Sequence, residues 1–179
     1  MAHSLSDTIA LLERTPSTLV ALLHGLPESW TSGNEGEGTF TVPDVIGHLI
    51  YADKENWLPR VRRILEDGES KPFEAFDRWG HVGECRGKSL PQLLEEFSRV
   101  RTVCLGQLTS LKLETEQLDR RGKHPALGPV KLSELLATWA AHDLTHLHQI
   151  SRIMAGSYRG QVGPFAAFLG VLKCDAHGG

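Results

Sequence analysis

The side chains best suited to chemistry lie together in residues 141–149, which read AHDLTHLHQ. His142 and His146 are four residues apart, so a helix would place both imidazoles on one face. Gln149 falls on the same face. Two imidazoles one turn apart can bind a single metal ion, although such pairs also occur as ordinary packed residues. The spacing therefore makes this segment the first candidate for a metal site.

A third ligand is available on another segment with helical spacing. His48 lies beside the apolar edge formed by Val45 and Ala52. A lone histidine there is commonly structural, but with His142 and His146 it would give three nitrogen ligands from two facing helices, as in bundle sites. Three protein ligands leave an open position for water or substrate. Neutral imidazole ligands suit zinc, and nickel is also possible.

Three further polar residues have helical positions near this set. Asp143 falls on an apolar arc, so its carboxylate needs a partner. It could accept a hydrogen bond from a ligand histidine, or pair with an arginine, or make a contact across an oligomer interface. Glu55 and Tyr51 share the face of His48. Glu55 could be a general base or a fourth ligand, although a solvated helix face is the simpler interpretation.

The three cysteines offer weaker support for nucleophilic chemistry. They form no Cys-x-x-Cys pair, which argues against a disulfide framework and favours a reducing cytoplasm. Cys104 has the spacing of a core residue. Cys85 lies in a loop with nothing nearby in the sequence to activate it.

Composition narrows the class of protein. The 179 residues suit one domain, predicted over 1–179, and 40% are hydrophobic, enough for a core. Lys plus Arg is 19 and Asp plus Glu is 22, a net charge of −3, so no basic surplus favours nucleic acid. The short cluster Arg60, Arg62 and Arg63 is interpreted as a solvated face. No apolar run reaches the ~18 residues that would span a membrane. We therefore predict a cytoplasmic protein without nucleic-acid or membrane partners.

Periodicity predicts an all-α protein with four long helices, a short C-terminal helix and almost no strand. Pro16 and Pro59 should interrupt the first two helices, the second near Glu55, because proline donates no backbone N–H. Gly47 in mid-helix suggests close approach by a neighbour. The expected spans are 4–26, 42–66, 90–111, 131–155 and 164–172.

The long connection over 67–88 bears on topology. A helix as long as the second spans ~36 Å, and twenty-two extended residues can reach ~70 Å. The connection can therefore return along the bundle and make the second and third helices parallel. Phe73, Phe76 and Trp79 would anchor it to the bundle surface. In the last short helix, Phe165, Phe168 and Leu169 are expected to pack inward.

Four segments carry a resemblance to a known family. They are residues 42–49 (VPDVIGHL), 58–62 (LPRVR), 72–77 (PFEAFD) and 135–150 (LLATWAAHDLTHLHQI). Through these motifs the chain resembles the DinB-like (DinB/YfiT) family of metal-binding four-helix bundles. The resemblance implies an up-down-down-up bundle with a long crossover between helices 2 and 3. It places the family's metal triad on His48, His142 and His146, with Gln149 beside the site.

The resemblance also bears on activity. Members of the family bind divalent metals such as zinc or nickel and often form homodimers. Some resemble metal-dependent hydrolases, and others are transferases or isomerases that use a low-molecular-weight thiol. Two hypotheses follow: a metal-dependent enzyme acting on a small molecule, by hydrolysis or thiol transfer, and a non-catalytic metal-stabilised bundle that serves as a binding or stress-response module. Fold analogy alone does not choose between them.

Overall fold

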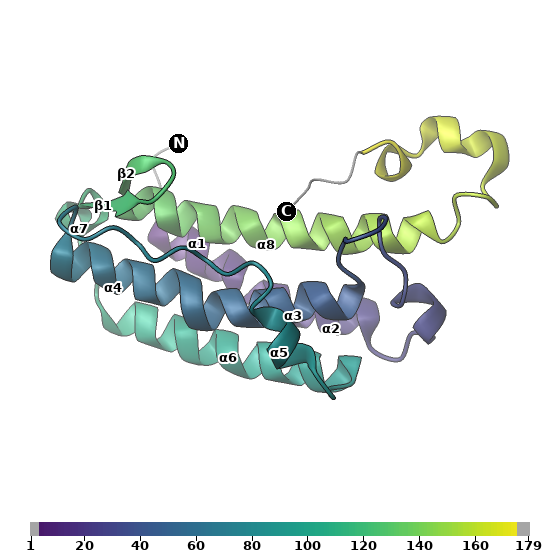
Figure 1. Cartoon of the computed structure of the whole chain (residues 1–179), viewed down its shortest axis with the longest axis horizontal. Helices are drawn as coiled ribbons and strands as arrows, with labels where there is room; N and C mark the ends of the chain where they lie inside the picture. The colour runs from purple at the N-terminus through teal and green to yellow at the C-terminus, as the bar shows by residue number, and fades with distance from the viewer. Residues whose placement is uncertain (1–3, 175–179) are drawn as a thin grey trace.

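Four long helical rods lie side by side in the computed structural model, which describes residues 4–174 (Figure 1). The third rod is α6 (Leu90–Ser110) and the fourth is α8 (Leu132–Gly156). The first two rods are each built from consecutive pieces: α1 (Leu5–Leu12) with α2 (Arg14–Leu23), and α3 (Val42–Ala52) with the π-helical η2 (Asp53–Trp57) and α4 (Leu58–Asp67).

Shorter elements join the rods. They are η1 (Glu28–Trp30), α5 (His81–Cys85), α7 (Thr115–Leu118), the strands β1 (Arg121–His124) and β2 (Gly128–Lys131), and the 3-10 turns η3 (Gly163–Phe168) and η4 (Gly170–Leu172).

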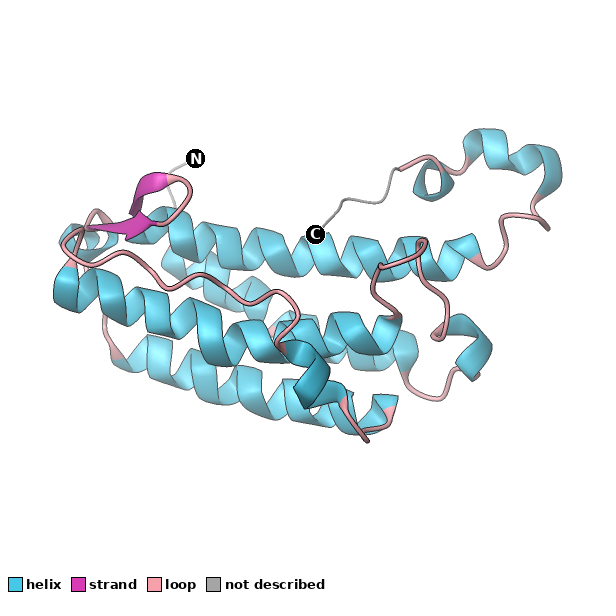
Figure 2. Ribbon diagram, in the orientation of Figure 1, coloured by secondary structure: helices cyan, strands magenta, loops and turns pink. Residues whose placement is uncertain are grey.

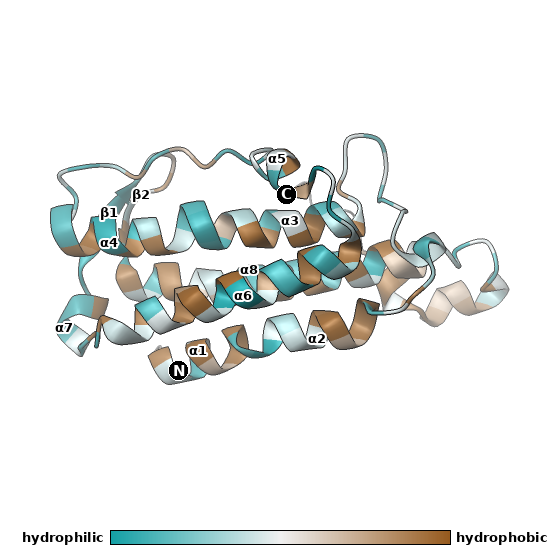
Figure 3. Ribbon diagram, turned by 90° about the horizontal axis from the view of Figure 1, so that it is seen from below, coloured by the Kyte–Doolittle hydropathy of each residue, from teal (hydrophilic) through white to brown (hydrophobic). Residues whose placement is uncertain are grey.

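The rods run up, down, down and up. The second and third rods are parallel because the chain between α4 and α6 travels back along the whole bundle before α6 begins (Figure 1). This topology confirms the predicted fold. Apolar residues of the rods face one another in the middle of the bundle (Figure 3), and all four rods contribute to one core. Leu12, Leu19, Ile46, Leu93 and Leu136 are all fully buried.

Short polar signals start the helices where the sequence predicts. The Thr41 hydroxyl accepts from the backbone N–H of Asp44, whose carboxylate accepts from the Thr41 N–H at 2.9 Å. This reciprocal pair satisfies donors that the first turn leaves free. The Gln92 side chain likewise accepts the Ser89 N–H at 2.8 Å at the start of α6.

Both predicted interruptions are present. The first rod breaks at Glu13, three residues before Pro16. The second becomes π-helical over Asp53–Trp57, just ahead of Pro59. Since Pro59 has no N–H for the carbonyl of Glu55, the regular ladder fails there and a wider turn takes its place.

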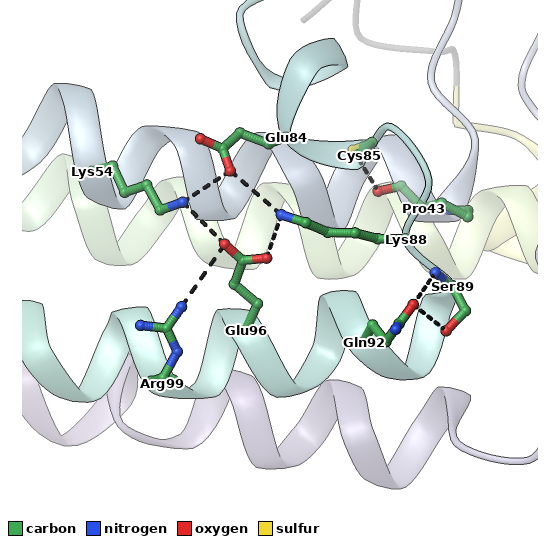
Figure 4. A network of polar contacts seen from close by, with 9 residues as sticks. All are labelled: Pro43, Lys54, Glu84, Cys85, Lys88, Ser89, Gln92, Glu96 and Arg99. Carbon is green, nitrogen blue, oxygen red and sulfur yellow. Dashed lines mark hydrogen bonds and ion pairs between the residues drawn. The ribbon is translucent and has the colours of Figure 1, made fainter.

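Helix α5 of the crossover packs directly against α3. A Cβ atom added at Gly47 would lie 2.0 Å from the Cys85 Sγ, so only glycine allows this approach. The predicted close neighbour of Gly47 is therefore α5. The Cys85 thiol lies 3.7 Å from the carbonyl oxygen of Pro43 (Figure 4).

A network of ion pairs connects α5 and the residues after it to η2 and α6 (Figure 4). Lys54 of η2 pairs with Glu84 at 2.9 Å and with Glu96 of α6 at 3.0 Å, and Lys88 pairs with Glu96 at 2.6 Å. These pairs are partly exposed, so each contributes little alone. Together they connect the crossover to two rods.

The crossover aromatics differ in burial. Phe73 is buried and Phe76 partly so, as predicted, but Trp79 is 52% exposed, with ring contacts to Phe40 and His81. Trp79 is thus a weaker anchor than the sequence suggested.

The polar stretch before α8 folds into an antiparallel hairpin of β1 and β2, which the sequence analysis did not foresee (Figure 2). The hairpin lies on α4 and the crossover: the Phe73 N–H donates to the Lys123 carbonyl at 2.8 Å. A Cβ at Gly122 would meet Ile64 at 2.6 Å and Phe73 at 2.8 Å, so glycine permits the contact. Four-residue strands carry too weak a pattern to be recognised alone.

The prediction for the C-terminal segment was wrong in its packing. Two 3-10 turns replace the expected helix over 164–172, and Phe165 and Phe168 are 70% and 86% exposed. Of this segment only Leu172 is buried among the described residues. Within residues 4–174, no helix is both long and apolar enough to cross a membrane.

Candidate metal centre

Three imidazoles meet between the second and fourth rods. His48 comes from α3, and His142 and His146 come from successive turns of α8. The Nε2 atom of His142 lies 3.2 Å from that of His48 and 3.1 Å from that of His146. One ring nitrogen from each residue lies within 4.8 Å of the others. The structure thus brings together the three histidines singled out from the sequence.

The spacing of these nitrogens fits a shared cation. Two imidazoles bound to zinc at ordinary bond lengths and a tetrahedral angle have their nitrogens about 3.3 Å apart. The Nδ1 of His146 donates to the Gln149 amide oxygen at 2.8 Å, which leaves its Nε2 lone pair directed at the other two rings. The donor set therefore suits a divalent metal ion.

Burial keeps these imidazoles neutral. It is the main cause that lowers the pKa of His48 to about 3, helped by His146 and His81. Burial also lowers the pKa of His142 well below its usual value, and it lowers that of His146 although Gln149 and Asp143 act in the opposite direction. The neutral ring is the form that binds metal, so no proton need be displaced near pH 7.

Aromatic side chains fix the orientation of the rings. The His48 ring is 5.6 Å from Phe40 and 5.7 Å from Phe76, between centroids. Trp57 meets the His142 ring edge-on at 5.1 Å and stacks on Trp139. Of the ring nitrogens of these three histidines, the buried Nδ1 atoms of His48 and His142 have no hydrogen-bond partner among the described residues.

The histidines form one wall of a cavity of about 500 Å³ that opens to the surface. Its other walls come from α3, α4, the crossover, the hairpin and α8. The lining is mostly apolar and contains no aspartate or glutamate. It comprises Phe40, His48, Ala52, Asn56, Arg60, Ala75, Phe76, Arg78, His124, Pro125, His142, Thr145, His146 and Gln149.

The other predicted site residues lie apart from these rings, except Gln149. Glu55 and Tyr51 line a smaller adjoining cavity between α4 and the crossover, and Glu55 is exposed. Asp143 faces away from the histidine nitrogens and binds Arg101, with N–O distances of 2.5 and 3.0 Å. Of the partners considered for Asp143, the arginine is the one present.

This buried arginine was not predicted from the sequence. Arg101 of α6 also donates to both carboxylate oxygens of Asp53, at 2.7 and 3.1 Å, and to the carbonyl oxygen of Leu12. The indole N–H of Trp139 completes the group by donating to Asp53 at 3.1 Å. We call Arg101, Asp53, Asp143 and Trp139 the arginine cluster. An arginine within the apolar stripe of α6 was the available signal.

Two smaller interpretations can be compared with the structure. Arg62 is exposed, as expected, but Arg60 is half-buried and lines the cavity, so the solvated-face interpretation was wrong for it. Cys85 and Cys104 are poor nucleophiles, because burial raises the pKa of each thiol to about 11. A thiolate at either position would be scarce at neutral pH.

Comparison with known proteins identifies the family. Residues 11–150 match the sequence model of the DinB superfamily, so the chain belongs to that superfamily. No curated protein matches this chain in sequence. Among solved structures, it is similar to YfiT from Bacillus subtilis, with a TM-score of 0.72 and 18% identity over 87% of this chain and 89% of that one. YfiT is described as a probable metal-dependent hydrolase with an unusual four-helix bundle topology.

Proposed function

We propose that this protein is a metal-dependent enzyme of the hydrolase type that acts on a small molecule in the cavity beside the three histidines. The observation that carries the proposal is the convergence of the His48, His142 and His146 Nε2 atoms at metal-ligand spacing on the wall of an open cavity. The description of YfiT as a probable metal-dependent hydrolase supports it.

A divalent ion bound by three imidazoles would act as a Lewis acid and lower the pKa of a water molecule, because one coordination position stays open. The protein's own part is to orient the ligands. Gln149 fixes the ring of His146 through its Nδ1, Phe40 and Phe76 pack against the ring of His48, and Trp57 packs against that of His142. The amide oxygen of Asn56, buried and unpartnered, can accept a hydrogen bond from a substrate.

The open cavity favours an enzyme over the non-catalytic alternative. A structural metal site is normally closed by four protein ligands. Here the described residues supply three, and the space beside them would admit a small molecule. The predicted homodimer, the cytoplasmic location and the choice between zinc and nickel stay predictions.

Metal content is the direct test. Protein purified without a nickel column should carry about one equivalent of a divalent metal by mass spectrometry, and His48→Ala and His146→Ala should carry almost none. His24→Ala is the matched control because His24 lies at the end of α2, outside the cavity. No metal in the wild type, even after zinc or nickel is added, would refute the proposal.

A reactivity screen then separates the two candidate chemistries. Small esters and amides, offered without a thiol, should be cleaved only by the metal-loaded wild type. Conjugation that requires an added low-molecular-weight thiol, without cleavage, would instead assign thiol transfer. Neither reaction in a fully loaded protein would favour the binding module.

A further inference from the structure

The cavity beside the histidines carries positive charge without a compensating carboxylate. Arg60 of α4 and Arg78 of the crossover both line it, and no aspartate or glutamate does. Within residues 4–174, neither arginine forms an ion pair, whereas Arg63, Arg99, Arg101 and Arg152 all do. Arg60 is half-buried and Arg78 is exposed, and neither guanidinium is neutralised by a carboxylate among the described residues, so an anion placed beside them would be attracted.

Contacts with the protein hold both guanidinium groups at the cavity. The Arg60 Cζ lies 5.1 Å from the centre of the Phe73 ring, and its Nη2 donates to the Glu74 carbonyl oxygen at 3.4 Å. The Arg78 Cζ lies 5.9 Å from the Phe40 ring. Besides these contacts, each guanidinium retains further N–H donors that can bind a planar oxyanion.

The positive charges of Arg60 and Arg78 also affect the histidines that line the cavity. Burial lowers the pKa of Arg60, and burial together with Arg60 lowers the pKa of His124 across the cavity. Arg78 contributes, after burial, to the lowered pKa of both His48 and His146. Arg60 also lines the adjoining cavity with Glu55, Glu74 and Asp77, but among the described residues no ion pair joins it to any of these carboxylates.

We propose that this cavity selects small organic anions, an apolar body carrying a carboxylate or another oxyanion, and that Arg60 and Arg78 are the residues that bind the anionic group. The apolar lining accommodates the body of the molecule and the arginines orient it beside the histidines. The proposal rests on the proposed function for the idea that the bound molecule is a substrate, but the selectivity itself needs no metal.

The test uses probes matched in shape and different in charge. Binding of 3-phenylpropionate, phenylphosphonate, the neutral 3-phenylpropionamide and the cationic 3-phenylpropylamine would be measured by calorimetry. Metal-free and zinc-loaded protein would be compared, because an anion can also bind a metal directly. We expect the anions to bind metal-free protein about tenfold more tightly than the amide, and the amine to bind least. Whichever of the two anions binds more tightly identifies the oxyanion.

Variants assign the selectivity to the two arginines. Arg60→Gln and Arg78→Gln should each reduce the preference for the anion over the amide, and the double variant should abolish it. Arg62→Gln is the matched control: it removes one positive charge from the same helix, at an exposed position outside the cavity. It should leave the preference unchanged. Thermal unfolding of each variant would confirm that it is folded.

The outcomes separate this inference from the proposed function. Equal affinity for the anions and the amide, or a preference that survives in the double variant, would overturn the inference. A preference that appears only with zinc and ignores the arginines would also overturn it, while supporting the metal site. An arginine-dependent preference in a protein that binds no metal would uphold the inference and remove the metal-dependent enzyme.

Discussion

Two polar clusters occupy the same bundle core, and they differ in how their polar atoms are used. In the arginine cluster every carboxylate oxygen of Asp53 and Asp143 accepts a hydrogen bond, and the group is almost completely buried. In the histidine cluster three nitrogens point at one another, two further ring nitrogens have no partner among the described residues, and the rings adjoin an open cavity.

The difference distinguishes a polar group that maintains structure from one available for a ligand. A buried polar network is stabilising only when each polar group has a hydrogen-bond partner. The arginine cluster meets that condition with hydrogen bonds between residues of this chain. The histidine cluster does not, because lone pairs that face one another need a shared proton or cation between them. The two clusters share α8 and are linked through Trp57, which stacks on Trp139 and contacts His142, so variants can test them against each other.

The largest effect on stability should follow from replacing Arg101. Arg101→Met leaves two buried carboxylates without their partner, which should cost about 3–5 kcal/mol of unfolding free energy. The melting temperature should fall by about 10 °C for a chain of this size. Calorimetric melting of metal-free protein would measure it.

A second variant makes this test specific. Adding Asp53→Asn and Asp143→Asn to Arg101→Met removes the uncompensated charges and should recover part of the loss. His48→Phe, in the other cluster, should change the melting temperature of metal-free protein far less. A wild-type melting temperature for Arg101→Met would contradict the distinction between the clusters.

Acid should affect the two clusters in opposite directions. The folded pKa of His48 is lowered to about 3, below its unfolded value, so His48 contributes stability above about pH 6.5 that is lost as the pH falls. At pH 5 the loss should be about 2 kcal/mol from this residue alone. Burial raises the pKa of Asp53 to about 6, so Asp53 contributes stability at low pH that is lost as the pH rises through 6.

Urea unfolding of metal-free protein between pH 5 and pH 7.5 would measure these contributions. His48→Phe should flatten the loss of stability toward pH 5, and Asp53→Asn should deepen it. The same pH profile in wild type and His48→Phe would show that the histidine is not held neutral by the fold.

A smaller effect should follow from removing the hydrogen bond that orients one ring. Gln149→Leu keeps the size of the side chain and leaves the Nδ1 of His146 without its acceptor. Loss of such a partner should weaken zinc binding about tenfold. Competition with a chromophoric chelator would measure the affinity, with Gln107→Leu as the control because Gln107 is exposed on α6. Unchanged affinity would show that Gln149 does not position His146.

The sequence predicted the parts of this molecule that local patterns determine. The helices followed from apolar spacing and caps, the interruptions followed from Pro16 and Pro59, and the pairing of His142 with His146 followed from their four-residue spacing. The partner of Asp143 could be reduced to a few alternatives, since a carboxylate on an apolar arc must be satisfied. Selecting Arg101 required knowing which faces of α6 and α8 meet.

The rest depended on contacts between segments far apart in the chain. The hairpin is stabilised by its contact with Ile64 and Phe73. The residue pattern of a four-residue strand does not indicate such a contact. The exposed Phe165 and Phe168 looked like core residues because hydrophobicity alone does not show whether a partner surface exists. Arg60 looked like a surface charge because it belongs to a short basic cluster with Arg62 and Arg63, and only the folded crossover makes its position part of a cavity.

The π-helical turn η2 determines which residues face the cavity on the second rod. His48, Ala52, Asn56 and Arg60 all line it, at steps of four residues. In an unbroken α-helix these steps drift by about 40° each, so Arg60 would lie about 120° away from His48. The wider turn accommodates one extra residue, which reduces the angle between Arg60 and His48 by about 100°. In effect η2 is a one-residue insertion that resets the phase of the helix. Without that extra residue, the same rod would keep His48 at the cavity and turn Arg60 away from it, so a single residue in η2 determines whether the cavity has both.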